Sequence, residues 1–441
     1  MVVWNGTYNR VNRLEDIYSA LGEKICLYPF FGAFYQTNNV IPIHEEGRPN
    51  SVRPCSIIQS EPAGKWDILD GSIHHARNSA AWLRLRQQFI DGEFDSIHDC
   101  RSCSHNERVG GTSPRQQNNK FLAEFLTVDI VQEVQAIIAN DNLVQDIITL
   151  DYYPSNYCNY SCVMCAGGAS TQRLTFEVQV LGRKEKIVMN QPEEDLYSIL
   201  DRVAIINFTG GETALQKPVH RIMDDLIQRD LAKNIVITLL TNASSSVSEL
   251  LEKFRHFRKV IYNVSIDGIG RVIEYQRRGC SWPTVAANSL ELLFHPDIST
   301  VVNYVLTAIN ALTIMDFVNW CYDHGVGPNL PEYVDGSFIN VSPVFRVDYL
   351  GVAALPPELR DCALAKLRLG RDRFLGPRVL DEYYRNLVDR FISVIESTPH
   401  VPAYIDRFIE HIRYEDQVSS RPLIEVVPEW APYFTRSGQD Q

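Results

Sequence analysis

The sequence lacks several features that would place it in a special class of proteins. It contains no apolar run of about eighteen residues, so no membrane-spanning helix is expected. The first residues, Met1–Gly6, show no basic start followed by a long apolar core, and we therefore expect no secretory signal. Neither an internal repeat nor a low-complexity tract occurs. An ordinary globular protein is the expectation.

Positive charge is also scarce. The chain has 42 Lys and Arg residues against 54 Asp and Glu residues, a net charge of −12. A large non-specific nucleic-acid surface would be basic, so none is predicted, although a local basic groove stays compatible with this charge. The hydrophobic fraction of 45% and the charged fraction of 22% are usual for a soluble protein. A length of 441 residues predicts two or three structural units.

Cysteine, by contrast, is abundant and clustered. Seven of the ten cysteines fall into two groups with metal-ligand spacing, which predicts metal ligation in a reducing cytoplasm rather than disulfides. The tighter group is Cys158, Cys162 and Cys165, directly after the strand-like Ile147–Tyr153. Three local thiols could hold three irons of a [4Fe–4S] cluster and leave the fourth open to a ligand. Chance clustering and part of a zinc site are the alternatives.

This Cys-x3-Cys-x2-Cys spacing resembles the signature of the radical S-adenosylmethionine (radical SAM) enzymes. In that family the open iron binds S-adenosylmethionine, an electron from the cluster cleaves it, and the 5′-deoxyadenosyl radical abstracts a hydrogen atom from the substrate. A second motif, Gly210-Gly211-Glu212, follows the expected strand Ile205–Phe208. Two glycines allow the backbone to come close to a ligand. The motif matches the Gly-Gly-Glu loop that contacts the methionine amine in the family.

The resemblance extends to the end of the expected strand Val260–Ile266. It implies that Ser265 and Asp267 bind the ribose of the cofactor, a role that suits hydroxyl and carboxylate groups. The stretch Tyr275–Trp282 resembles the segment after that strand in many such enzymes, and an arginine in it could pair with a carboxylate or form a surface salt bridge. Cys280 in this stretch is a candidate hydrogen-atom donor, although lone cysteines are more often small buried hydrophobes.

The second cysteine group lies near the N-terminus. It consists of two single thiols and one Cys-x2-Cys pair, which could close a tetrahedral zinc site or hold a second [4Fe–4S] cluster, if the thiols are ligated at all. The layout resembles the SPASM and twitch auxiliary modules of radical SAM enzymes, although those modules usually follow the catalytic domain and this group precedes it. The matching residues are Cys26 with Pro29 and Phe30, Cys55, and Cys100 and Cys103 followed by Glu107 and Arg115.

Strand and helix patterns alternate in the middle of the chain. The expected strands after 147–153 are 205–208, 235–240, 260–266, 301–306 and 338–344, with helical patterns between them. Such alternation predicts an α/β protein with a parallel sheet, a partial (β/α)6 barrel of the radical SAM kind, whose site lies at the carboxyl ends of the strands. We expect an N-terminal auxiliary-cluster module and linker helix over 1–145, the barrel over 146–350 and a helical region over 351–441.

The resemblance implies a cytoplasmic radical SAM enzyme with an external one-electron reductant such as a flavodoxin or ferredoxin. The expected substrate is a ribosomally synthesised peptide that is crosslinked, epimerised or cleaved. The alternative is a radical dehydrogenase or epimerase of a small carbohydrate or aminocyclitol. A zinc-binding interaction protein is the alternative from another class.

Overall fold

A computed structural model describes residues 12–44, 50–56, 58, 72–108, 112–189, 196–328, 330, 338–344 and 347–436. The N-terminal segment Met1–Gly6 lies outside the described residues. So does Pro192, a residue that suits the first turn of a helix.

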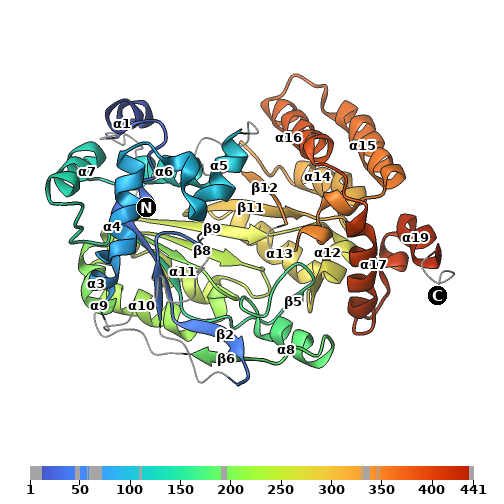
Figure 1. Ribbon diagram of the computed structural model, residues 1–441. Helices are drawn as coiled ribbons and strands as arrows, with labels where there is room; N and C mark the ends of the chain where they lie inside the picture. Colours follow the sequence, from blue (N-terminus) through green and yellow to red (C-terminus); the bar gives the residue numbers. More distant parts are fainter. Residues whose placement is uncertain are drawn as a thin grey trace.

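A sheet of eight strands runs through the molecule in the order β12-β11-β9-β8-β7-β4-β1-β3 (Figure 1). Six parallel strands, β4 to β12, form the expected partial barrel, and all five strands predicted after the first are present, the largest shift being the earlier start of β11. The strands are β1 (Gly32–Gln36), β3 (Ser51–Arg53), β4 (Thr149–Tyr153), β7 (Ile205–Phe208), β8 (Val236–Thr241), β9 (Lys259–Ser265), β11 (Ile298–Leu306) and β12 (Ile339–Pro343).

The N-terminal segment adds two strands to this sheet. β1 pairs in parallel with β4, and β3 pairs antiparallel with β1. The sheet therefore runs across the boundary that the sequence suggests between residues 145 and 146, and the division into three units stays a prediction. Two short antiparallel pairs lie outside the main sheet: β2 (Asn38–Pro42) with β6 (Glu185–Met189), and β5 (Ser161–Cys162) with β10 (Arg277–Arg278).

Helices connect the strands and form most of the C-terminal region, as expected. Those before β4 are α1 (Leu14–Leu21), α2 (Tyr28–Phe31), α3 (Ile73–Arg77), α4 (Ala80–Ile90), α5 (Arg101–Arg108), α6 (Pro114–Phe125) and α7 (Ile130–Ala139). Those between the strands are α8 (Thr171–Gln179), α9 (Leu196–Ile199), α10 (Lys217–Gln228), α11 (Ser248–Phe254), α12 (Gly270–Gln276), α13 (Trp282–Leu293) and α14 (Ile314–Asp323). The C-terminal helices are α15 (Pro357–Arg371), α16 (Val379–Ser397), α17 (Ala403–Asp416), α18 (Leu423–Val426) and α19 (Ala431–Arg436).

Local sequence signals explain several helix ends. Helix α7 begins where the Asp129 carboxylate accepts a hydrogen bond from the Gln132 N–H, and it stops before Asp141 and Asn142, whose φ angles are 54° and 61°. Helix α6 begins at a capping box in which Ser113 and Gln116 exchange side-chain to backbone hydrogen bonds. Both helices therefore start and stop where short-range hydrogen bonding satisfies their terminal groups.

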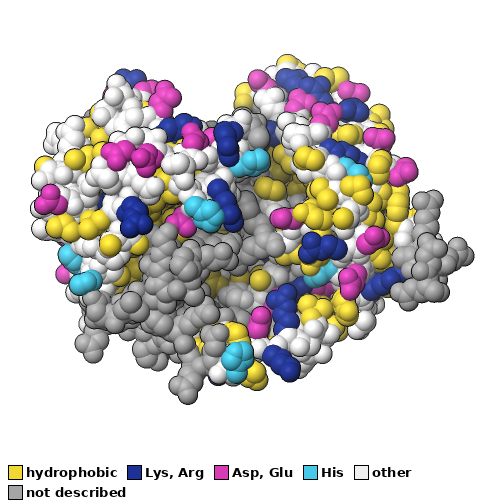
Figure 2. Space-filling view, viewed as in Figure 1, with side chains coloured by type: hydrophobic (Ala, Val, Ile, Leu, Met, Phe, Trp, Pro, Cys, Tyr) yellow, Lys and Arg dark blue, Asp and Glu magenta, His cyan; other side chains and the backbone are white. Residues whose placement is uncertain are grey.

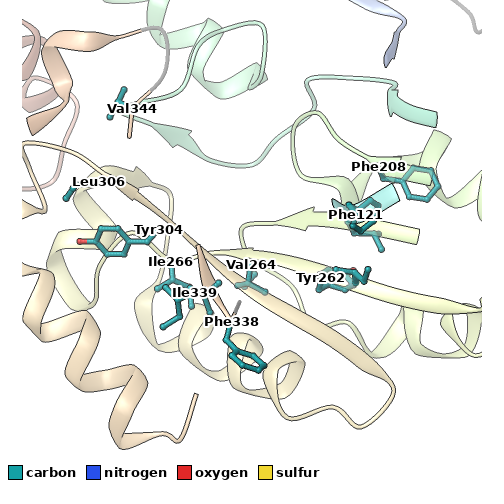
Figure 3. Packing of buried hydrophobic residues seen from close by; sticks show 14 of the residues in the cluster. Phe121, Phe208, Tyr262, Val264, Ile266, Tyr304, Leu306, Phe338, Ile339 and Val344 are labelled. Carbon is teal, nitrogen blue, oxygen red and sulfur yellow. The ribbon is translucent and has the colours of Figure 1, made fainter. Parts of the chain in front are cut away.

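One face of the sheet is apolar and is covered by helices. Tyr262 of β9 packs edge-on against Phe254 of α11, with ring centroids 5.6 Å apart. Tyr304 of β11 packs against Phe317 of α14 at 4.6 Å and Phe391 of α16 at 5.2 Å. Figure 3 shows Tyr262, Tyr304 and neighbouring side chains of this hydrophobic cluster. Because strand side chains alternate, the residues between these must point to the other face.

The other face of the sheet is polar. The strand register puts Asp151, Asn207 and Thr238 side by side on β4, β7 and β8. It also puts Ser265, Asn303 and Asn340 side by side on β9, β11 and β12. In full barrels bulky branched side chains fill the inside. A row of hydrogen-bonding groups at this position indicates a surface that faces a ligand or water.

Surface charge agrees with the composition. Figure 2 shows Lys and Arg side chains interspersed with Asp and Glu over the described residues of one face, without a large basic area. Within the part of the chain that the structure describes, no helix is both long and apolar enough to cross a membrane.

Candidate active site

The cysteine loop, residues 154–170, leaves the carboxyl end of β4. Cys158 and Cys162 are buried and Cys165 is half-buried, and all three are free thiols. Burial raises the pKa of the Cys162 thiol, Arg277 opposes that rise, and Cys165 and Cys158 add to it. The three thiols therefore lie near one another, although no three His, Cys, Asp or Glu side chains among the described residues are arranged to hold a metal ion, and metal ligation stays a prediction.

Several donors point at these sulfur atoms. The Asn242 side-chain nitrogen lies 3.8 Å from Cys158 Sγ, and the Tyr160 N–H lies 3.5 Å from the same atom. Arg277 Nη1 lies 3.8 Å from Cys162 Sγ. Hydrogen bonds and a positive charge both favour the thiolate, which is the form that ligates metals. These donors oppose the burial that raises the pKa of all three thiols.

The Gly-Gly-Glu loop packs directly on the cysteine loop. The Gly211 N–H donates to the Ser155 carbonyl at 3.1 Å, and the Glu212 N–H donates to the Tyr157 carbonyl at 2.9 Å. A Cβ atom on Gly211 would lie 2.1 Å from the Tyr157 carbonyl oxygen, and one on Gly210 would lie 2.4 Å from the Ser155 oxygen. The glycines are thus required where two backbone segments meet, a reason that differs from the close approach to a ligand inferred from the sequence.

The Glu212 carboxylate is buried and hydrogen-bonded. It accepts from the Thr241 hydroxyl at 2.8 Å and from the Asn242 N–H at 2.6 Å. Burial raises the pKa of Glu212 to about 7, against the lowering effect of these hydrogen bonds. Glu212 therefore joins the end of β8 to the cysteine loop, since Asn242 also reaches Cys158. Its contact with the cofactor amine stays a prediction.

Ser265 and Asp267 occupy different surroundings. Ser265 is half-buried at the end of β9, on the polar face. Asp267 is fully buried, and its carboxylate accepts from the Val305 N–H at 2.8 Å and from Arg277 at 2.6 Å. Asp267 thus holds Arg277 against Cys162. A ribose contact for either residue stays a prediction.

Cys280 lies beside the cysteine loop. The half-buried thiol packs against the hydrophobic cluster of Cys158, Tyr160 and Cys162. Burial is the main reason that its pKa rises to about 11. This position is compatible with the small buried hydrophobe that lone cysteines usually are, and hydrogen-atom donation stays a prediction.

The N-terminal cysteines line one small cavity of about 20 Å³. Cys26, Cys55, Cys100 and Cys103 contribute to its wall together with Arg115. Arg115 pairs with Glu107 through two bonds of 2.9 Å and donates to the Ile25 carbonyl at 2.6 Å. The two residues noted in the sequence therefore brace the chain next to Cys26.

The four N-terminal thiols lie close together. Burial raises the pKa of Cys100, and the nearby thiols Cys26, Cys55 and Cys103 raise it further, so the four sulfurs are close neighbours. Among the described residues, however, no three His, Cys, Asp or Glu side chains are arranged to hold one metal ion. Ligation of a metal or cluster by these thiols stays a prediction.

The sequence did not predict the hydrogen-bond network on the polar face of the sheet. The Tyr28 hydroxyl donates to Asp151 at 2.9 Å, and the Asn207 side chain contacts both residues. Tyr28 also lines the N-terminal cavity, so a single side chain joins the two regions. The only sequence signal was a polar residue at alternate positions within apolar strands, which becomes informative once the strand register is known.

Four half-buried asparagines continue this network, and we call them the amide ladder: Asn207, Asn263, Asn303 and Asn340. Asn303 donates to Asn263 at 3.4 Å, and Asn340 donates to Asn303 at 3.1 Å. The Thr238 hydroxyl donates to Asn207 at 2.7 Å. None of the four carries a charge, and each amide offers both donors and an acceptor.

Comparison with known proteins agrees with this geometry. Residues 152–317 match the family model of the radical SAM superfamily. This span includes the three loop cysteines, the Gly-Gly-Glu loop and the end of β9. Fold and match together define a radical SAM domain. The match concerns residues 152–317 alone and does not name a reaction.

Solved structures of low identity are also similar. The match to native anSMEcpe with bound AdoMet and Kp18Cys peptide has 18% identity and a TM-score of 0.36, and covers 52% of this chain and 61% of that chain. The match to Streptococcus suis SuiB bound to precursor peptide SuiA has 14% identity and a TM-score of 0.34, and covers 75% and 69%. This chain thus spans less than two thirds of the length of anSMEcpe. No curated protein matches the sequence.

Proposed function

We propose that this protein cleaves S-adenosylmethionine reductively at a [4Fe–4S] cluster held by Cys158, Cys162 and Cys165. Such a cluster, when bound, supplies the electron that produces a 5′-deoxyadenosyl radical. The observation that carries the proposal is the placement of three thiols on one loop, with Asn242 donating to Cys158 and Arg277 to Cys162. The packing of the Gly-Gly-Glu loop on the same segment supports it.

The chain's own residues would bind and orient the cofactor. Gly210, Gly211 and Glu212 border the cysteine loop, where the methionine end must lie if its amine and carboxylate reach the open iron. Ser265 ends a neighbouring strand and offers a half-buried hydroxyl. Asp267 contributes by holding Arg277, which supplies positive charge beside Cys162.

For the substrate we propose a peptide segment that enters over the amide ladder. The ladder is uncharged and half-buried, and its donors and acceptors suit the backbone amides of a peptide. The products considered are a crosslink, an inverted centre or a cleaved backbone. Sugar hydroxyls could bind the same groups, so a dehydrogenase or epimerase of a small carbohydrate or aminocyclitol is the second candidate.

The N-terminal thiols are proposed ligands of an auxiliary [4Fe–4S] cluster. Cys26, Cys55, Cys100 and Cys103 line one cavity, which supports a shared ligand for the four thiols. The proposal includes that residues 1–145 form a module similar to the SPASM or twitch modules. A zinc-binding interaction protein is the alternative that it opposes.

The proposal also includes the cellular compartment, the electron donor and the hydrogen-atom donor. All ten cysteines are free thiols, which supports a reducing cytoplasm. The electron would come from a small reductant protein such as a flavodoxin or ferredoxin. If the substrate radical is quenched by hydrogen return, Cys280 is the candidate donor.

The test begins with the triple variant Cys158→Ala, Cys162→Ala, Cys165→Ala. It should form no 5′-deoxyadenosine under anaerobic reducing conditions and retain iron only at the N-terminal site. The single variant Cys321→Ala is the control, because that buried thiol lies outside both cysteine groups. Undiminished cofactor cleavage in the triple variant would refute the assignment.

The substrate class needs a separate experiment. A short peptide encoded beside the gene is co-expressed with the enzyme and analysed by mass spectrometry. Loss of two hydrogens indicates oxidation, deuterium uptake from heavy water indicates inversion, and a missing fragment indicates cleavage. If the peptide is unchanged while a sugar or aminocyclitol is converted, the second candidate is correct.

A further inference from the structure

The end of helix α17 holds the segment that binds the cysteine loop. Two consecutive acids do this: Glu415 pairs with Arg278 at 3.1 Å, and Asp416 accepts from the Tyr275 hydroxyl at 2.7 Å. Tyr275 and Arg278 flank the residues that run along the cysteine loop. Helix α17 therefore contacts the segment 275–278 at both of its ends.

Glu415 lies at the centre of a buried group of charges. Its side chain is 1% exposed, and the carboxylate also contacts Arg173 and lies 3.2 Å from His411 Nε2. Burial raises the pKa of Glu415, but the hydrogen bond from His411 and the charge of Arg173 outweigh it and leave this pKa below its usual value. Glu415 is therefore ionised and pairs with the buried Arg173 and the half-buried Arg278.

Both arginines belong to the surroundings of the cysteine loop. Arg278 Nη2 donates to the Ser161 hydroxyl at 2.8 Å, and β10 pairs with β5, which contains Ser161 and Cys162. The Val163 N–H donates to the Gln276 carbonyl at 2.8 Å. Arg173 lies on α8, the helix that follows the loop. Glu415 is thus connected to the middle of the cysteine loop through Arg278 and to the helix that follows the loop through Arg173.

The geometry points to α17 as a part of the catalytic apparatus: we propose that Glu415 is a positioning residue that fixes the cysteine loop through Arg173 and Arg278. Removing the carboxylate would leave Arg278 without its anion and Arg173 with Glu177 alone at 3.7 Å, and both guanidinium groups would shift toward other acceptors. The Arg278–Ser161 bond would weaken, and the three thiols would lose their fixed arrangement. The proposal rests on the proposed function only where it concerns cofactor cleavage.

The test compares Glu415→Gln with Glu410→Gln, an exposed acid on the same helix, in the anaerobically purified full-length protein. Hydrogen exchange of the amides of 158–165 and 276–280 is measured first. Loss of a hydrogen bond to a charged group predicts exchange about tenfold faster in Glu415→Gln. The Michaelis constant for S-adenosylmethionine and the electron paramagnetic resonance signal of the reduced protein should also change. Glu410→Gln should match the wild type in all of these measurements.

A double variant separates positioning from stability. Arg278→Gln combined with Glu415→Gln removes both charges, so part of the lost melting temperature should return. The contact with Ser161 stays absent, and exchange in the loop should therefore remain fast. If loop exchange returns to the wild-type rate together with stability, the role of Glu415 is merely structural and the inference is wrong.

Two further outcomes are decisive. If Glu415→Gln does not accumulate as folded protein, Arg278→Gln removes the contact between Glu415 and β10 and should accelerate loop exchange in the same direction. Unchanged exchange in that variant would overturn the inference. If the wild type cleaves no S-adenosylmethionine, the proposed function fails, and the exchange data still decide whether α17 positions the loop.

Discussion

Replacing Gly211 by alanine tests how the Gly-Gly-Glu loop meets the cysteine loop. The new Cβ would lie 2.1 Å from the Tyr157 oxygen and 2.5 Å from its carbonyl carbon. Real Cβ atoms essentially never approach other heavy atoms within 3.0 Å, so the two backbones must separate by about 1 Å. Neither segment can avoid this by turning a side chain, because the obstructing atoms belong to the backbone.

The expected cost follows from the contacts that this separation breaks. Overpacking a close-packed site costs about 1–3 kcal/mol, and the two backbone hydrogen bonds from Gly211 and Glu212 contribute about 1 kcal/mol each. We therefore expect the free energy of unfolding to fall by about 3–5 kcal/mol. A shift of about 1 Å in a positioned group also costs about a hundredfold in rate, so 5′-deoxyadenosine formation should fall at least that much.

The assays are denaturant unfolding and chromatographic measurement of 5′-deoxyadenosine per bound cluster. Gly351→Ala is the matched control, because its φ of −80° suits alanine and its nearest atom would lie at 3.2 Å. That variant should lose little stability and no activity. If Gly211→Ala is as stable and as active as Gly351→Ala, the close approach of the two loops is wrong.

Three further predictions concern metal content, pH and charge. With two cubane clusters the anaerobic protein should carry about eight irons, and Cys100→Ala with Cys103→Ala should remove about half of them; one zinc with about four irons would favour the zinc site. Burial raises the pKa of Asp151 to about 6 from 3.8, so the folded state binds this proton more tightly and stability should fall as the pH rises from about 4 to about 6. Asp151→Asn should remove that fall, worth about 3 kcal/mol, in unfolding experiments at pH 4 and pH 8, and an unchanged pH dependence would contradict it. Arg277→Gln should lower the reduction potential of the cluster, because a positive charge beside Cys162 favours the added electron, and an unshifted potential would show that Arg277 acts on Asp267 alone.

The sequence by itself determined the elements of the barrel. Apolar runs with turn residues between them located every strand from 205–208 to 338–344, because a buried parallel strand needs a continuous apolar segment. Compact spacing located Cys158, Cys162 and Cys165, since one cluster can only be ligated locally by thiols a few residues apart. The Gly-Gly-Glu motif was recognised from its residues after an expected strand. The structure adds that its glycines lie where two backbone segments meet.

Tertiary structure decided what depends on contacts between distant residues. No local pattern predicts that β1 pairs with β4, since pairing depends on which edge is free after the other strands have assembled. The amide ladder becomes visible only through the strand register. Glu415 and Arg173 are 242 positions apart in the sequence, so their contact could not be inferred before the chain was folded. Sequence periodicity reports which face of an element is buried, whereas the partner of that face is chosen by the packing of the whole chain.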